Sequence, residues 1–133
     1  MKYIAVDFDG TCVYNKYPEI GENNPGAIET LQKLAKKNKI ILLTMRSGVL
    51  LSAAKQWFSD NNIPLYSVNS NPSQTSWSKS NKIFANFYID DNNLGCPYFI
   101  KDGKRAVDWS VISTHIKKEG LIWILKKLFG IIF

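Results

Sequence analysis

Four short apolar runs alternate with stretches of helical periodicity, and this alternation constrains the fold more than any other feature of the sequence. The runs predict strands over residues 3–7, 40–44, 65–68 and 87–90. Between them, Asn24-Pro25 begins a helix that ends near Asn38, and a second helix covers residues 48–60. Continuous apolar strands joined by helices are typical of a parallel sheet. The sequence therefore predicts an α/β fold with a three-layer α/β/α, Rossmann-like parallel sheet.

The remaining chain predicts smaller elements. Residues 69–81 are polar and rich in turn formers, so we expect a surface loop. Asp102-Gly103 lies between two alternating runs and predicts a β-hairpin, and Asp108 caps a further helix that ends near Gly120. Residues 116–133 form an amphipathic C-terminal helix or tail. With 133 residues the chain is long enough for one domain, 1–133.

Composition and charge narrow the partners. The formal net charge is +6, which favours an anionic partner such as a phosphorylated substrate. The lysines are scattered singly or in pairs, so nucleic acid is permitted but not indicated. Two cysteines are too few for a disulfide framework, and the N-terminus does not resemble a secretory signal peptide. We therefore expect the protein to be cytoplasmic.

Polar side chains follow three of the four predicted strands. They are Asp7 with Asp9, Thr44 with Arg46, and Asp90 with Asp91. In an open parallel sheet, ligands bind outside the carboxyl ends of the strands, so these side chains converge on one crevice. Clustered carboxylates repel one another unless a cation lies among them, and Mg²⁺ prefers oxygen ligands. An aspartate is also a known covalent nucleophile toward phosphoryl groups.

The order of these motifs carries a family resemblance that covers about residues 3–91. Asp7-Phe8-Asp9-Gly10-Thr11, Thr44, a lysine before the fourth strand, and Asp90-Asp91 together resemble the four motifs of the haloacid dehalogenase superfamily of phosphatases. The resemblance implies that Asp7 is the nucleophile and that Asp9 is the general acid and base. It also implies a Mg²⁺ site made by Asp7, the main-chain carbonyl of Asp9 and the Asp90-Asp91 pair, of which either aspartate could be the direct ligand.

The same resemblance assigns the phosphate-binding residues. Thr44 would hydrogen-bond a phosphoryl oxygen, and a lysine would neutralise charge on the transferring group. Lys82 is the first choice because we expect it at the start of a short helix leading into the fourth strand, and Lys79 is the alternative. Arg46 could clamp a phosphate or another anionic group through two hydrogen bonds. Gly10 allows the tight turn of the backbone out of the first strand.

The spacing leaves no room for a large cap domain after the first motif or between the second motif and the lysine. We therefore expect an open site and a magnesium-dependent phosphomonoester hydrolase that acts through an aspartyl-phosphate. Two alternatives stay open: a polynucleotide end-processing phosphatase, and a catalytically weak binding or assembly module. Asn92 favours the second alternative, because relatives with a double aspartate commonly follow it with arginine. The apolar tail predicts a subunit contact in a homo-oligomer rather than a helix on a membrane surface.

Overall fold

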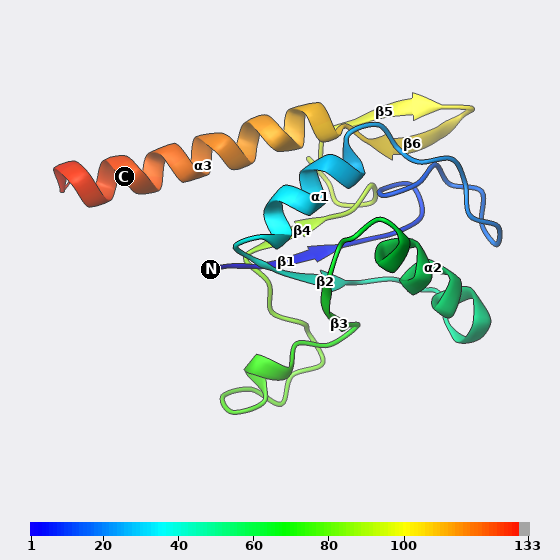
Figure 1. The fold of residues 1–133 in the computed structure, drawn as a ribbon, viewed down its shortest axis with the longest axis horizontal. Helices are drawn as coiled ribbons and strands as arrows, with labels where there is room; N and C mark the ends of the chain where they lie inside the picture. Colours follow the sequence, from blue (N-terminus) through cyan, green and yellow to red (C-terminus); the bar gives the residue numbers. More distant parts are fainter. Residues whose placement is uncertain (131–133) are drawn as a thin grey trace.

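A four-stranded parallel sheet forms the centre of the protein (Figure 1). The computed structural model describes residues 1–130. The strands are β1 (Tyr3–Val6), β2 (Lys39–Leu42), β3 (Leu65–Val68) and β4 (Phe87–Ile89), in the order β3-β2-β1-β4. All three pairings are parallel, so the carboxyl ends of the strands lie at one edge of the sheet.

Three helices cover one face of this sheet: α1 (Ala27–Ala35), α2 (Gly48–Asp60) and α3 (Trp109–Phe129). Side chains of a strand alternate between faces, so Ile4, Val6 and Leu42 point to the same side. They form one buried cluster with large apolar residues of the helices, which include Leu31, Leu34, Trp57, Phe58, Trp109 and Ile112. Each large apolar side chain buried in this way contributes about 1.5–3 kcal/mol.

The second face of the sheet is covered by a thinner layer. Ala5 and Ile41 pack there with Ala85 and Ile83, which belong to the connection between β3 and β4. This connection contains one short 3₁₀ helix, η1 (Pro72–Gln74). The predicted α/β, Rossmann-like fold with helices flanking a parallel sheet and no large cap domain is confirmed, and its third layer is mostly irregular chain.

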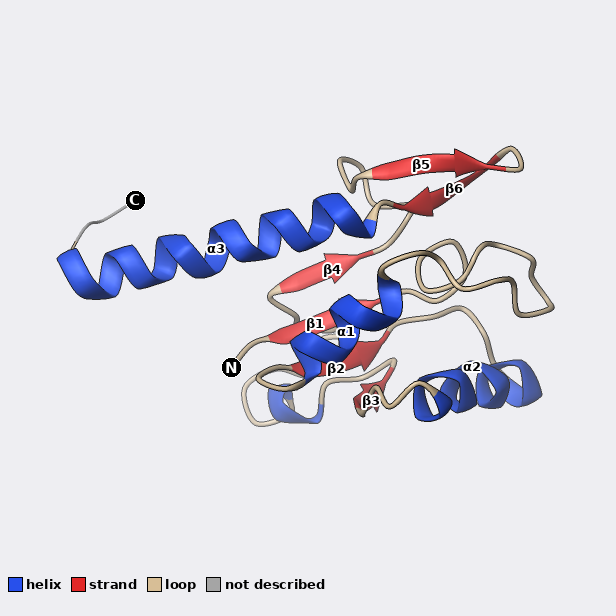
Figure 2. Ribbon diagram, turned by 45° about the horizontal axis from the view of Figure 1, so that its top comes forward, coloured by secondary structure: helices blue, strands red, loops and turns tan. Residues whose placement is uncertain are grey.

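The predicted hairpin at Asp102-Gly103 is also present. Strands β5 (Tyr98–Lys101) and β6 (Lys104–Val107) pair antiparallel, and both turn residues have positive φ, as a two-residue hairpin requires. The amide of Val107 donates to the carbonyl of Gly10 at 3.0 Å. The hairpin is therefore anchored to the loop that follows β1 (Figure 2).

Two helix boundaries differ from the prediction. Asn24 does not cap α1, because its buried side-chain amide donates to the carbonyls of Thr11 and Val107, and the helix begins after Gly26. Gly120 does not end α3, which continues to Phe129 and stops at Gly130 with φ 62°. A glycine inside a helix costs about 1 kcal/mol, which the good helix formers around Gly120 outweigh.

Beyond its first turns, α3 extends past the sheet (Figures 1 and 2). Trp109 and Ile112 are buried in the core, whereas Leu128 and Phe129 are 69% and 67% exposed. The last part of the predicted tail, residues 131–133, lies outside the described residues. Within residues 1–130, none of the helices combines the length and hydrophobicity needed to span a bilayer.

Candidate active site

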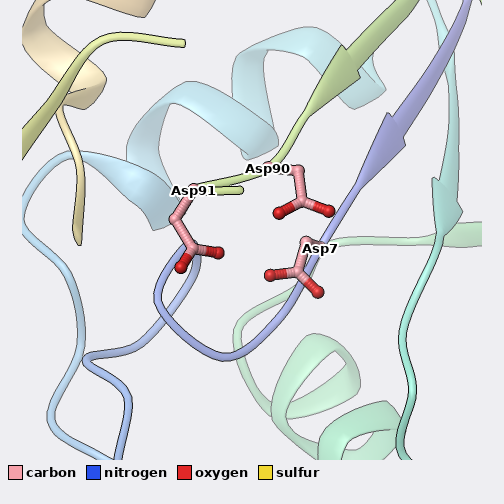
Figure 3. Close-up of side chains that lie close together, drawn as sticks. All are labelled: Asp7, Asp90 and Asp91. Atoms are coloured by element: carbon pink, nitrogen blue, oxygen red, sulfur yellow. The ribbon is translucent and has the colours of Figure 1, made fainter. Parts of the chain in front are cut away.

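Three of the four aspartates that were predicted to converge meet at the carboxyl edge of the sheet, and the fourth, Asp9, is paired with Arg46 instead. Asp7 directly follows β1, and Asp90 and Asp91 directly follow β4, its neighbour in the sheet. One carboxylate oxygen from each lies within 4.8 Å of the others. Figure 3 shows the three side chains turned toward a common point. Such a set of hard oxygen donors can hold a divalent cation.

The loop after β1 is shaped to bring Asp91 close to Asp7. Gly10 has φ +81°, and a Cβ atom at this position would lie 2.6 Å from Oδ2 of Asp91. The predicted need for glycine at this turn is therefore confirmed, with the close approach of Asp91 as a second reason.

Thr11, for which the sequence predicted no role, links two of the three carboxylates. Its fully buried hydroxyl lies 3.1 Å from Oδ2 of Asp7 and 3.4 Å from Oδ1 of Asp91, and it accepts from the Asp91 amide at 3.3 Å. Its one proton serves one carboxylate at a time. Its place directly after Gly10 in the first motif was the signal available in the sequence.

Burial raises the pKa of two of these acids, Asp7 and Asp91. Burial, followed by repulsion from Asp90, raises the pKa of Asp7 to about 8. Burial is also the main reason why the pKa of Asp91 is raised. At neutral pH Asp7 therefore retains a proton in the isolated cluster, and a bound cation would favour the ionised form.

The Asp9 carboxylate is bound to Arg46 rather than placed in the cluster of Asp7, Asp90 and Asp91. Its Oδ2 and Oδ1 accept hydrogen bonds of 2.7 and 2.8 Å from Nε and Nη2 of Arg46. The Arg46 side chain is 1% exposed and that of Asp9 is 15% exposed. Hydrogen bonding to the Asp9 carboxylate is the main reason why the pKa of Arg46 is raised.

The predicted contact between Arg46 and an anionic substrate is therefore corrected. Besides Asp9, the guanidinium donates to the carbonyls of Pro18, Glu19 and Leu50. A guanidinium has five N–H groups, and these contacts use all of them. The bidentate contact is present, but it binds a carboxylate of the protein itself.

Thr44 lies just beyond the end of β2. The predicted strand ends two residues early, at Leu42, because the backbone N–H and C=O of Thr44 pair with the side-chain amide of Asn69. The Thr44 hydroxyl accepts from the amide of Arg46 at 3.1 Å, which uses a lone pair and leaves its proton available for donation.

The two candidate lysines lie in irregular chain. The predicted short helix at Lys82 is absent, because side chains satisfy the backbone there: Ser80 accepts from the Lys82 amide, and Gln74 donates to the Lys82 carbonyl. No contact joins the ammonium of Lys79 or Lys82 to Asp7 within residues 1–130. Their roles stay predictions.

A small cavity of about 80 Å³ adjoins the acidic cluster. It is lined by Ala5, Asp7, Leu43, Tyr88, Ile89, Asp90 and Asn93. A larger groove of about 760 Å³ lies between β4 and α3, and it contains none of the predicted site residues. The small cavity is the better candidate site because carboxylates line it.

The chain is similar to a conserved protein from Bacteroides thetaiotaomicron whose structure has been solved. The two are 37% identical, the match covers 89% of this chain and 91% of that one, and the TM-score is 0.74. The chain belongs to the same family as this Bacteroides protein. No protein-family model and no curated protein matches the chain. The similarity supports the fold and brings no activity with it.

Proposed function

We propose that the protein is a phosphomonoester hydrolase of the haloacid dehalogenase type, dependent on Mg²⁺. The observation that carries the proposal is the convergence of Asp7, Asp90 and Asp91 at the carboxyl edge of the parallel sheet. The order of the motifs in the sequence, which resembles that superfamily, supports the same reading.

The acidic cluster fits the metal that this chemistry needs. Asp7, Asp90 and Asp91 offer oxygen donors within 4.8 Å of one another. The pKa of Asp7 is raised by burial and then by repulsion from Asp90, and a cation would offset both effects. By resemblance, the Asp9 carbonyl would complete the set. Bound Mg²⁺ would neutralise charge on the cluster and on the phosphoryl oxygens.

In the proposed reaction, an oxygen of the Asp7 carboxylate forms a bond to phosphorus while the bond to the leaving oxygen breaks. Asp9 gives a proton to that oxygen. Water then attacks the phosphorus of the aspartyl-phosphate, Asp9 takes the proton of the water, and the bond between Asp7 and phosphorus breaks. Thr44 and Lys82 would bind the phosphoryl oxygens, with Lys79 as the alternative lysine.

We place this activity in the cytoplasm, because Cys12 is buried and both cysteines are free. The buried Cys12 thiol is no competing nucleophile, since burial followed by the nearby Asp7 charge raises its pKa well above the usual value.

The test is hydrolysis of an aryl phosphate with and without Mg²⁺ by the wild type, Asp7→Asn and Asp9→Asn. We expect turnover that needs Mg²⁺, is lost in Asp7→Asn, and falls to a small but measurable residual rate in Asp9→Asn, because an aryl leaving group depends less on a proton donor. Absence of turnover in folded protein that binds Mg²⁺ would favour the binding or assembly module instead.

A polynucleotide end is a second candidate substrate. The uncapped site lies beside the β5–β6 hairpin, which is anchored at Gly10 and carries the exposed Lys101 and Lys104. Contacts to several phosphates would make substrate affinity fall steeply with salt. A KM for an oligonucleotide 5′- or 3′-phosphate that rises with salt more than that for an aryl phosphate would support this candidate.

A further inference from the structure

We propose that Arg46 is a positioning residue, which fixes the Asp9 carboxylate and ties it to the loop of residues 14–22. The catalytic part of this inference rests on the proposed function, because it uses the role of Asp9 in proton transfer. The structural part stands on contacts within the chain.

The contact with Asp9 fixes both oxygens of the carboxylate. Nε of Arg46 donates to Oδ2 at 2.7 Å, and Nη2 donates to Oδ1 at 2.8 Å. Two parallel bonds between planar groups define the orientation of the carboxylate as well as its position. Lysine, with a single ammonium, could not reproduce this geometry.

The remaining donors of Arg46 hold the loop. Nη1 and Nη2 donate to the carbonyls of Pro18 and Glu19 at 3.1 and 2.9 Å, and Nη1 also donates to the carbonyl of Leu50 in α2 at 3.4 Å. Arg46 thereby joins the first motif, the loop and the first turn of α2.

Two aromatic rings also lie against the guanidinium of Arg46. Its central carbon lies 5.2 Å from the centre of the Phe8 ring and 5.3 Å from that of Tyr17. Phe8 adjoins Asp9, and Tyr17 belongs to the loop, so the rings connect the same two segments as the hydrogen bonds. Cation–π contacts of this kind favour a fixed guanidinium plane.

This arrangement predicts that Asp9 and the loop are coupled. Loss of Arg46 would release both, and loss of the Asp9 charge would leave Arg46 with a weaker partner and so loosen the loop. For catalysis, a misplaced proton donor can cost about 100-fold in rate.

A double-mutant cycle tests the catalytic part. We would measure kcat and KM for an aryl phosphate with Mg²⁺ in the wild type, Arg46→Gln, Asp9→Asn and the double variant. We expect Arg46→Gln to lower kcat about 100-fold with little change in KM, and to cause no further loss in the Asp9→Asn background. Equal losses in both backgrounds would show a general structural role and overturn the proposal.

Arg46→Lys and Arg105→Gln complete the set of variants. Arg46→Lys keeps the positive charge but cannot make the two parallel hydrogen bonds to Asp9. It should therefore recover only a small part of the kcat that Arg46→Gln loses. Arg105 is exposed and stacks on Tyr98 at 4.8 Å, so Arg105→Gln should keep the wild-type kcat. Full recovery by lysine would contradict an orienting role.

Hydrogen exchange tests the structural part without turnover. We expect the amides of residues 14–22 to exchange at least about tenfold faster in Asp9→Asn and in Arg46→Gln, but not in Arg105→Gln. If Arg46→Gln does not fold, Asp9→Asn decides, because it keeps the arginine. Unchanged exchange in Asp9→Asn would refute the coupling. Missing turnover with faster exchange would refute the proposed function alone.

Discussion

Gly10 is the residue whose replacement most directly tests how the acidic cluster is assembled. Gly10→Ala adds a Cβ 2.6 Å from Oδ2 of Asp91 at a φ of +81°. A non-glycine residue in such a conformation costs about 1–3 kcal/mol, and Asp91 must also move. We expect lower stability in urea denaturation and a smaller rise of Tm with Mg²⁺.

Gly48→Ala is the matched control for this prediction. Gly48 also has a positive φ, +54°, but a Cβ there would meet nothing within 4 Å. The control should lose stability from backbone strain and keep the wild-type response to Mg²⁺. An equal response to Mg²⁺ in both alanine variants would show that the contact with Asp91 is unimportant for the cluster.

Asp7 makes the stability of the metal-free protein depend on pH. Its pKa is about 8 in the folded state and near 3.8 when unfolded, so the folded state binds the proton more tightly. Stability from this group is therefore greatest at low pH and falls as pH rises from about 4 to about 8, by at most about 1.4 kcal/mol per pH unit.

We would measure this by urea denaturation with a chelator at pH 5 and pH 8. Asp7→Asn removes the titrating group, so the variant should gain stability relative to wild type at pH 8 more than at pH 5. The raised pKa of Asp91 acts in the same direction and remains in the variant, so some pH dependence will persist. An identical pH dependence in both proteins would show that Asp7 is ordinarily ionised.

Individual site residues were predictable to different degrees. Asp7, Asp90 and Asp91 could be predicted to converge because strand ends and parallel pairing determine where they lie. The partner of Arg46 could not, since it depends on where the loop of residues 14–22 folds back, and no local pattern encodes that. The place of Thr11 in the first motif was a local signal, but its bond to Asp91 joins residues 80 positions apart and has no local pattern of its own.

At the scale of elements, the strands follow from apolar runs whose side chains must be buried. The residues at which the strands end depend instead on side chains that hydrogen-bond to the backbone. Asn69 pairs with the backbone of Thr44 and ends β2 earlier than the apolar run does. Asn24 looked like a helix cap because its local sequence suits one, yet its amide bonds Thr11 and Val107, far along the chain. Local propensity competes with such tertiary contacts and loses to them here.

Asn24 therefore joins three segments, and Asn24→Ala tests that role. In Asn24→Ala the Thr11 carbonyl keeps its hydrogen bond from Nε1 of Trp109, whereas the Val107 carbonyl loses its bond from the Asn24 amide. A buried acceptor left without its partner costs about 1–3 kcal/mol, which we expect in urea denaturation. Asn81 is exposed and serves as the control, since Asn81→Ala should change stability by less than about 0.5 kcal/mol. Equal effects of the two substitutions would contradict the role of Asn24.

At the scale of the whole molecule, α3 is buried at its start and exposed at its far end. Trp109 and Ile112 anchor the start of α3 in the core, but its far end carries Leu128 and Phe129 at 69% and 67% exposure. Exposed apolar side chains close together on a projecting helix are typical of an interaction surface. The predicted homo-oligomer would use this end of α3 as its contact.

Leu128→Glu tests the predicted oligomer. A charge in an apolar contact between subunits is costly, so we expect the wild type to be larger than a monomer at micromolar concentration and the variant to shift toward the monomer. The free energy of unfolding measured on the monomer should hardly change, because Leu128 lies outside the core clusters. Val49→Glu is the control: Val49 is 83% exposed on α2, so this variant should keep the molecular mass of the wild type in solution. Light scattering that finds a monomer for the wild type at all concentrations would refute the oligomer, and the apolar end of α3 would then need another partner.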